Sequence, residues 1–302
     1  MASFWLSILE QGLIFGIMVL GVYITYKILD FPDLSVDGSF PLGAAVVASS
    51  LVLGLHPLIA TILAFGAGMI AGGITGYLHI KFKITNLLSG ILVMIGLYSI
   101  NLRIMGKANV PLFQQNTIFS NPLQPIFIIV LFALFVKFGL DVFLKTKFGF
   151  LIKATGDNPQ LVTALGIDIG ITKIIALMIS NGLVALSGSL VAQYQRFSDV
   201  GMGSGIIVMG LASIIFGEAM LKKVSFIVPT TMALVGSVLY KTSTAFALKL
   251  GFPPTDLKLI TAVIVVSALA LNQKKFHFKG KKLFFMGGDT HVADTKSIKN
   301  LS

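Results

Sequence analysis

The sequence predicts an all-α polytopic membrane protein with about nine (eight to ten) membrane-spanning segments. Hydrophobic residue types form 55% of the 302 residues and charged types only 12%, which is about half the charged fraction of a soluble domain. Apolar runs of roughly 20 residues, long enough to cross a bilayer as helices, recur along the chain. Both observations exclude a soluble globular fold, and the high hydrophobicity also excludes a disordered chain.

Six long apolar runs and three shorter ones are the predicted membrane segments. The long runs lie at residues 4–28, 57–80, 87–105, 123–143, 171–195 and 224–248. The shorter runs lie at residues 39–54, 204–219 and 257–271. We therefore expect residues 1–271 to form a transmembrane domain and residues 272–302 to form a basic tail.

The net charge of +11 predicts an orientation and not a nucleic-acid surface, because the basic residues lie between the apolar runs. With the loop 144–170 on the cytoplasmic side, strict alternation places fifteen Lys and Arg residues of loops and tail on that side and six outside. Basic residues accumulate on the cytoplasmic side of membrane proteins. The C-terminus is thus expected in the cytoplasm and the N-terminus outside, and an even number of segments would reverse one end.

Two parts of the chain share one pattern of segments. Residues 4–80 and 171–248 each contain a long span, a polar break, a short span and another long span, with breaks at 30–39 and 196–205. The two units start five segments apart, so they would run in opposite directions through the membrane. Interrupted spans at matching places in inverted halves indicate a transport pathway. The alternative is a chance similarity of two polar turns.

The first break contains residues suited to a polar path. Asp, Ser and Gly interrupt and cap helices, and irregular backbone at membrane depth requires protein or water to satisfy its polar groups. If this break enters the membrane, we expect Ser35, Asp37 and Ser39 to face a polar path. The alternative is a cytoplasmic turn with Asp37 or Ser39 as the N-cap of the next helix, and both interpretations can hold together.

The loop 144–170 contains the signals of a short capped helix. Gly156 precedes Asp157 or Asn158 as the cap, Pro159 stands at the first helical position, and Gly166 ends the helix after Leu165. A docking element between two spans would have this form. The residues alone predict an ordinary structural loop equally well.

Gly68, Gly72 and Gly76 are spaced four residues apart in one apolar run. Small residues at this spacing let two helix backbones approach closely in a membrane. The stripe therefore predicts a helix-packing surface, either within the chain, which we favour, or between subunits or repeats.

The sequence contains no convincing catalytic or metal-binding set. Neither a phosphate-binding loop nor the metalloprotease and serine-hydrolase motifs occur. Cysteine is absent and the four His residues are scattered, whereas a metal site needs clustered ligands. Few acidic residues fall inside the spans, which argues against a proton-coupled pump. We therefore expect a transport subunit without a metal or cofactor of its own.

The order and spacing of these motifs resemble the permease subunits of bacterial ABC importers, in the branch for branched-chain amino acids and ribose-type sugars. The resemblance covers roughly residues 10–272. The motifs that carry it are residues 156–167, the end of the following span at 183–190, and residues 33–38. The last motif departs from the family pattern, because Asp37 is inserted before Gly38. Residues 208–217 resemble a further segment of the family, but Glu218 follows where a Gly- or Ser-rich turn is more usual. Residues 37–44 and 251–262 resemble the sub-branch for tryptophan or tyrosine.

The resemblance implies a type II importer fold, a permease homodimer, two separate ATPase subunits that hold ATP and Mg²⁺, and an extracellular substrate-binding protein. It implies an amino acid, possibly an aromatic one, as cargo, and the bacterial plasma membrane as location. The residues that would contact the ATPase are Gly156, Asp157, Asn158, Pro159, Leu165 and Gly166. The residues on or near the pathway would be Ser35, Asp37, Gly38 and Ser39.

Two other functions remain open from the sequence. An ion-coupled secondary transporter would move its cargo without ATP. A membrane-embedded enzyme or a purely structural subunit is less favoured, because no convergent catalytic set is present. Neither the cargo nor the residues that contact it follow from the sequence.

Overall fold

The computed structural model describes residues 2–120, 124–221 and 227–251, together with residues 253, 256, 259, 262, 263 and 266. Lys222, Lys223, most of the predicted segment 257–271 and the whole tail 272–302 lie outside the described residues.

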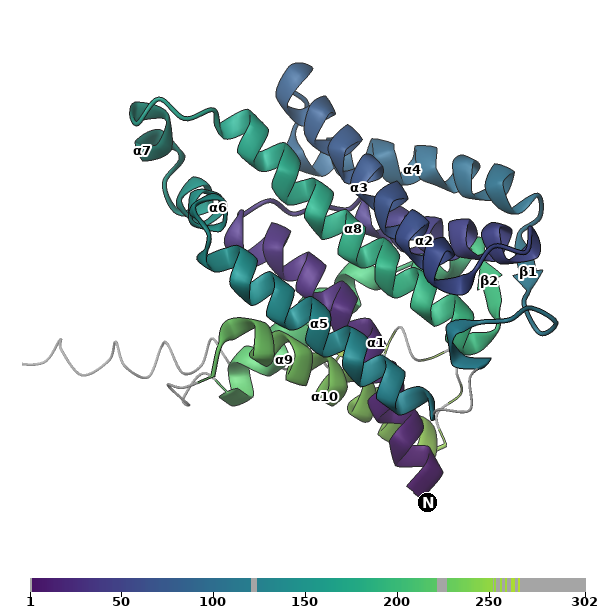
Figure 1. Cartoon of the computed structure of the whole chain (residues 1–302). Coiled ribbons are helices and arrows are strands. Elements are labelled where there is room, and N and C mark those ends of the chain that lie inside the picture. Colours follow the sequence, from purple (N-terminus) through teal and green to yellow (C-terminus); the bar gives the residue numbers. More distant parts are fainter. Residues whose placement is uncertain are drawn as a thin grey trace, which may run out of the picture.

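The described chain is almost entirely helical (Figure 1). Its long helices are α1 (Ala2–Tyr23), α3 (Pro57–Lys81), α4 (Asn86–Met105), α5 (Pro125–Lys145), α8 (Ile169–Gln195) and α10 (Pro229–Lys249). Its shorter helices are α2 (Val36–Val52), α6 (Lys147–Asp157), α7 (Pro159–Ala164) and α9 (Ile206–Leu221). A π-helical turn, η1 (Ile24–Ile28), continues α1, and two 3-10 turns, η2 (Ile118–Ser120) and η3 (Val200–Gly203), lie in the connections.

Six helical segments of the described chain are long and apolar enough to cross a membrane, which makes this a multi-pass membrane protein. They are Phe4–Ile28, Pro57–Lys81, Asn86–Met105, Pro125–Lys145, Ile169–Gln195 and Val200–Leu221. The sequence predicts nine segments, of which one, 257–271, lies mostly outside the described residues, and two more are not among the six. One reason is that α2 is apolar but has only 17 residues. Another is that α10 contains several Ser, Thr and Lys residues.

The two ends of the helix bundle differ. We call one end the α6–α7 end; there α6 packs on η1. The end of α3 meets the start of α8 at this end, where His79 and Lys173 are 3.5 Å apart. Lys27 of η1 also forms an ion pair with Glu218 of α9 there (2.9 Å). At the other, the β1–β2 end, the start of α3 meets the end of α8, where Gln193 donates to Thr61 (2.8 Å). Figure 1 shows the two ends on opposite sides of the bundle.

The expectation of a purely helical chain needs one correction. Strands β1 (Asn109–Pro111) and β2 (Phe197–Asp199) form a small antiparallel sheet in which Val110 faces Ser198. Both strands lie in connections that follow long helices. There the ladder pairs the backbone groups of Val110 and Ser198, which are both buried.

Helix α8 forms the centre of the bundle and packs against α1, α2 and α3. The glycine stripe of α3 makes the closest of these approaches. A Cβ atom on Gly68 or Gly72 would collide with backbone atoms of Asn181 or Leu177, and one on Gly76 would lie 2.9 Å from Ile174. The three glycines therefore face α8 of the same chain, so the backbones of α3 and α8 lie almost in contact.

Candidate functional site

A buried polar cluster lies where the first break meets the middle of α8. Asp33 is 2% exposed. Its carboxylate accepts hydrogen bonds from the Ser35 backbone N–H (2.8 Å), the Ser35 hydroxyl (2.6 Å) and the Asn181 amide (2.8 Å). A buried carboxylate is tolerated only with such partners. The cluster therefore fixes the path of the chain between η1 and α2.

Asn181 joins the break to α8. Its side-chain oxygen accepts from Ser35 (3.1 Å) and Ser39 (2.7 Å), and its amide also donates to the Leu177 carbonyl (3.1 Å). The structure thus places Ser35 and Ser39 in the protein interior, with both hydroxyls directed at α8. Sequence reasoning missed Asn181, although an amide inside an apolar span is itself a signal of a functional or structural constraint.

Asp37 connects the two breaks. Its two carboxylate oxygens accept from the backbone N–H groups of Gly205 (3.0 Å) and Ile207 (2.8 Å). These donors lie at the start of α9, where unpaired N–H groups and the helix dipole favour a negative charge. Asp37 therefore stabilises the N-terminus of α9, a helix distant in sequence, although it stands in the first turn of α2.

A cavity of about 530 Å³ adjoins this contact. Its wall includes Asp37 and Gly38 from α2, Tyr98 and Asn101 from α4, and Gly201 from η3. Asn101 donates to the Gly38 carbonyl (3.2 Å), and its own side-chain oxygen has no partner in the described part of the chain. The cavity thus has a mixed lining, in which Asp37 and Asn101 stand among apolar side chains such as Met94 and Ile95. No cluster of possible metal ligands occurs among the described residues.

The loop between α5 and α8 contains two helices, although the sequence predicts only the second. Thr146 caps α6 by accepting from Gly149 (3.2 Å), and Asn158 caps α7 by accepting from Leu161 (3.1 Å). Pro159 stands at the first position of α7, and Gly166 adopts a left-handed φ of 74° just after that helix. Of the two cap residues that the sequence allows, the structure uses Asn158.

Most of the residues singled out in this loop are exposed at the α6–α7 end. Asp157, Asn158, Pro159 and Gly166 are exposed, and Leu165 is 68% exposed. Sequence reasoning missed two apolar side chains beside them, Phe150 (69% exposed) and Leu161 (55% exposed). Exposed apolar side chains grouped outside the spans mark an interaction surface.

Gly156 differs from its neighbours because it faces the bundle. A Cβ atom at this position would collide with the Ile28 carbonyl oxygen and lie 3.1 Å from the Cα atom of Leu29. Ile28 ends the π-helical turn η1, and π-turns inside helices frequently occur at functional sites. Helix α6 therefore rests on the segment that leads into the buried Asp33 cluster.

Residues 4–269 match the family described as branched-chain amino acid transport system / permease component. The chain belongs to this family. Over 274 residues this permease is 54% identical to the tyrosine transport system permease protein of Clostridioides difficile, a match that covers 91% of this chain and 93% of that one. It is 28% identical to a probable branched-chain amino acid transport permease protein, LivH, of Methanocaldococcus jannaschii, over 70% of this chain and 73% of that one.

A solved structure, PsaBC from Streptococcus pneumoniae in complex with Fab, has a similar fold, with a TM-score of 0.52 and 15% identity. The match covers 86% of this permease and 89% of that chain. The family assignment makes this permease a transport component of an ABC transporter and not an enzyme. Components of this kind work in general with ATPase and binding-protein partners.

Proposed function

We propose that this permease imports a small solute, an amino acid, with aromatic amino acids as the cargo class. In this proposal an extracellular binding protein delivers the cargo, and separate ATPase subunits supply the energy by hydrolysing ATP with Mg²⁺. The observation that carries the proposal is the 54% identity to a tyrosine transport permease across 91% of the chain. A similarity of this extent and coverage supports the same cargo class.

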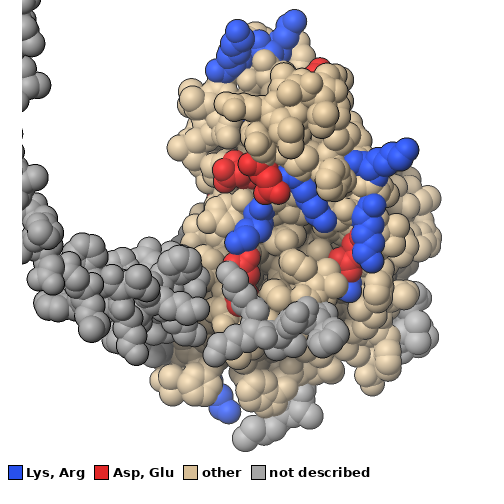
Figure 2. Space-filling view, turned by 90° about the vertical axis from the view of Figure 1, so that its left-hand side faces the viewer, with Lys and Arg blue, Asp and Glu red and all other residues tan. Residues whose placement is uncertain are grey.

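In the proposed orientation the α6–α7 end faces the cytoplasm of a bacterial cell, and the tail 272–302 follows on the same side. Figure 2 shows several Lys and Arg side chains spread over this end of the molecule, with Asp and Glu side chains among them. Lys81 ends α3, while Lys145 and Lys147 flank the junction of α5 and α6. The orientation rule for basic residues supports this assignment.

The ATPase would dock on the exposed side of α6 and α7. Asp157, Asn158, Pro159, Leu165 and Gly166 offer a polar and apolar surface outside the spans. Gly156 has a different part in this proposal, because it faces inward. Closure of the ATPases would move α6, and the close contact at Ile28 would pass the movement to η1 and to the break beside Asp33.

The pathway would run along the first break, past Ser35, Asp37, Gly38 and Ser39. The cavity beside Asp37 and Gly38, which has both polar and apolar lining residues, supports this position. Ser35 and Ser39 do not line this cavity; their hydroxyls are hydrogen-bonded to Asn181, so in this proposal they join the pathway only when the break moves away from α8.

Inverted repeats and a two-fold homodimer complete the proposal. Contacts between helices support the repeats: Gly68 and Gly72 of α3 pack on α8, and Gly12 and Gly16 of α1 pack on α10. The short helices α2 and α9 both begin at a break, and their N-termini meet through Asp37. The second half therefore has the same kinds of contact as the first.

The buried carboxylates argue against an ion-coupled mechanism. Glu10 accepts from Tyr194 (2.7 Å), and Asp141 forms an ion pair with Lys137 (2.9 Å). Asp33 and Asp37 are held by the hydrogen bonds described above. These carboxylates are thus engaged in structural contacts, whereas a relay needs groups that exchange protons or ions along a path.

Reconstitution tests the function. The permease is placed in liposomes with its ATPase and binding protein, and uptake of labelled tyrosine is followed. We expect uptake to require ATP and the binding protein. Uptake by the permease alone, driven by a sodium or proton gradient, would refute the proposal.

Two matched variants test the coupling route. Gly156→Val places a side chain against Ile28, so we expect ATP hydrolysis to continue while uptake falls steeply. Gly96→Val is the control, because a Cβ at Gly96 meets nothing within 4 Å. Equal uptake by both variants would exclude Gly156 as part of the coupling contact.

A further inference from the structure

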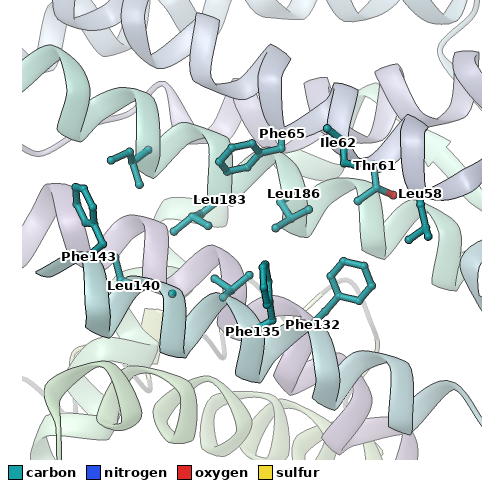
Figure 3. Close-up of a pocket in the computed structure, with 13 residues that line it drawn as sticks. Leu58, Thr61, Ile62, Phe65, Phe132, Phe135, Leu140, Phe143, Leu183 and Leu186 are labelled. Atoms are coloured by element: carbon teal, nitrogen blue, oxygen red, sulfur yellow. The ribbon is translucent and has the colours of Figure 1, made fainter.

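An apolar groove lies along the bundle between α3 and α5, with α8 as its floor. Its volume is about 520 Å³. Figure 3 shows Phe65 of α3 and Phe132 and Phe135 of α5 around it, with Leu183 and Leu186 of α8 between them. Among the side chains that line it, only that of Thr61 is polar, and its hydroxyl is engaged with the Pro57 carbonyl and with Gln193. The groove therefore offers an occupant only hydrocarbon contacts.

The groove is open on the face of the bundle that α3 and α5 present to the bilayer. Ile62 is 69% exposed and Phe135 76% exposed on its two rims. Both residues belong to helices long and apolar enough to cross the membrane. Hydrocarbon of the bilayer therefore has direct access to the groove.

A second cavity adjoins the groove at the β1–β2 end. Its volume is about 570 Å³, and the two cavities share Leu58 in their walls. Its polar lining residues are His56, Asn116, Thr117 and Ser120, and no acidic residue lines it. This second cavity, called the polar cavity below, thus offers hydrogen-bonding groups that the groove lacks, although Leu55 and Ile118 also line it.

The polar cavity has positive and hydrogen-bonding character. Arg196 donates to the Ser120 hydroxyl (3.4 Å), so a permanent positive charge lies behind this wall. The Nδ1 atom of His56 accepts from the Leu58 N–H (3.3 Å), which leaves the proton on Nε2. These groups are suited to a phosphate, which accepts hydrogen bonds and carries negative charge.

The depth of the two cavities matches the layers of a bilayer. Helices α3 and α5 begin at Pro57 and Pro125, so His56 lies at the end of a span, where lipid headgroups are found, and the groove lies among residues of the hydrocarbon layer. A helix is a poor occupant, because a span about 10 Å wide and about 30 Å long is several times larger than the groove. A free amino acid would leave its charged groups unpaired against apolar walls.

We propose that the groove and the polar cavity together bind one phospholipid from the leaflet at the β1–β2 end. One acyl chain lies between α3 and α5, over Leu183 and Leu186. The phosphate lies in the polar cavity beside His56 and Ser120, near the charge of Arg196. The lipid then fills the space between α3 and α5.

A groove-filling variant with a matched control tests the acyl-chain position. Gly139 of α5 lines the groove, and a Cβ there meets nothing within 4 Å. Gly139→Leu adds side-chain volume to the groove at a position where a Cβ has free space, and Gly139→Ala adds less. Gly96→Leu adds the same side chain in open space on α4, away from the groove.

The measurement is native mass spectrometry of the delipidated permease titrated with phosphatidylglycerol. We expect one tightly bound lipid for the unmodified protein and for Gly96→Leu. Gly139→Leu should weaken this binding at least tenfold, with Gly139→Ala in between. Equal lipid affinities of all four proteins would overturn the proposal. A change of oligomeric state in Gly139→Leu without loss of lipid would also overturn it, because the occupant of the groove would then be a second copy of the chain.

The headgroup position is tested with Arg196→Gln. We expect this variant to bind phosphatidylglycerol more weakly than the unmodified permease, while a neutral glyceride with the same acyl chains binds both proteins equally. An unchanged affinity for phosphatidylglycerol would place the phosphate elsewhere and overturn the assignment of the polar cavity.

Discussion

Substitution of Asn181 by Ala should destabilise the permease substantially, because one amide serves three side chains of the first break. The bond from its Nδ2 atom to the buried Asp33 carboxylate is charge-assisted, and loss of such a bond costs about 1.5–3 kcal/mol. Ser39 loses its bond to Oδ1, which adds about 1 kcal/mol. Ser35 keeps its shorter bond to Asp33 (2.6 Å) and adds little.

The sum is about 3 kcal/mol, or roughly a hundredfold change in the folding equilibrium. At about 2.1 cal/mol/K of unfolding entropy per residue, 1 kcal/mol lowers the melting temperature of a 302-residue chain by about 1.6 °C, so we expect a decrease of about 5 °C in detergent. The control is Ser180→Ala, at the position next to Asn181. It removes a single neutral hydrogen bond from the Ser180 hydroxyl to the Gly21 carbonyl (2.7 Å). That change should cost about 1 kcal/mol.

The isosteric change Asn181→Asp separates hydrogen bonding from volume. It preserves the shape of the side chain but places a second carboxylate beside Asp33, so it should destabilise at least as much as Asn181→Ala. If both Asn181 variants melted at the same temperature as Ser180→Ala, the polar cluster around Asp33 would not be a major determinant of stability, and this reasoning would be refuted.

Three further predictions concern packing and charge, each measured as a shift in melting temperature. Gly72→Leu should destabilise the permease by about 1–3 kcal/mol or more, because its side chain collides with Leu177. The control is Gly66→Leu on the same helix, which meets open space at its Cβ and should change the melting temperature little. Asp37→Asn should cost about 0.5–2 kcal/mol, because an amide supplies one acceptor where the start of α9 uses two; an unchanged melting temperature would contradict that role. Lys27→Ala should cost less than about 1 kcal/mol, because its ion pair is partly exposed, at 47% for Lys27 and 25% for Glu218, and a larger loss would show that this pair fixes the position of α9.

The sequence predicted the helical class and most helix boundaries, because apolar runs and helix signals act locally. The run 57–80 corresponds to α3, and Pro159 starts α7 as its position indicates. Helix α6 was missed because its residues are mixed in polarity and follow a long span after only one intervening residue, Thr146. The small sheet was missed because each strand has only three residues, and its pairing joins distant connections.

The candidate sites could be predicted only in part, because their partners come from distant positions. The sequence marks Asp37 as a polar residue in a break, but no local pattern shows that it serves the start of α9, 168 to 170 residues away. Gly156 reads as part of a turn, and only the folded chain reveals its contact with Ile28. Asn181 lies in an apolar run whose length alone predicts a span.

The contact between α3 and α8 restricts how the permease can change conformation. Because Gly68 and Gly72 bring backbone against backbone, no layer of side chains remains between these helices to change rotamer or slide. The same holds in part for α1 and α10 at Gly12 and Gly16. Each pair must therefore move as one rigid unit, and any opening and closing has to occur where the pairs meet longer side chains, along the short helices α2 and α9.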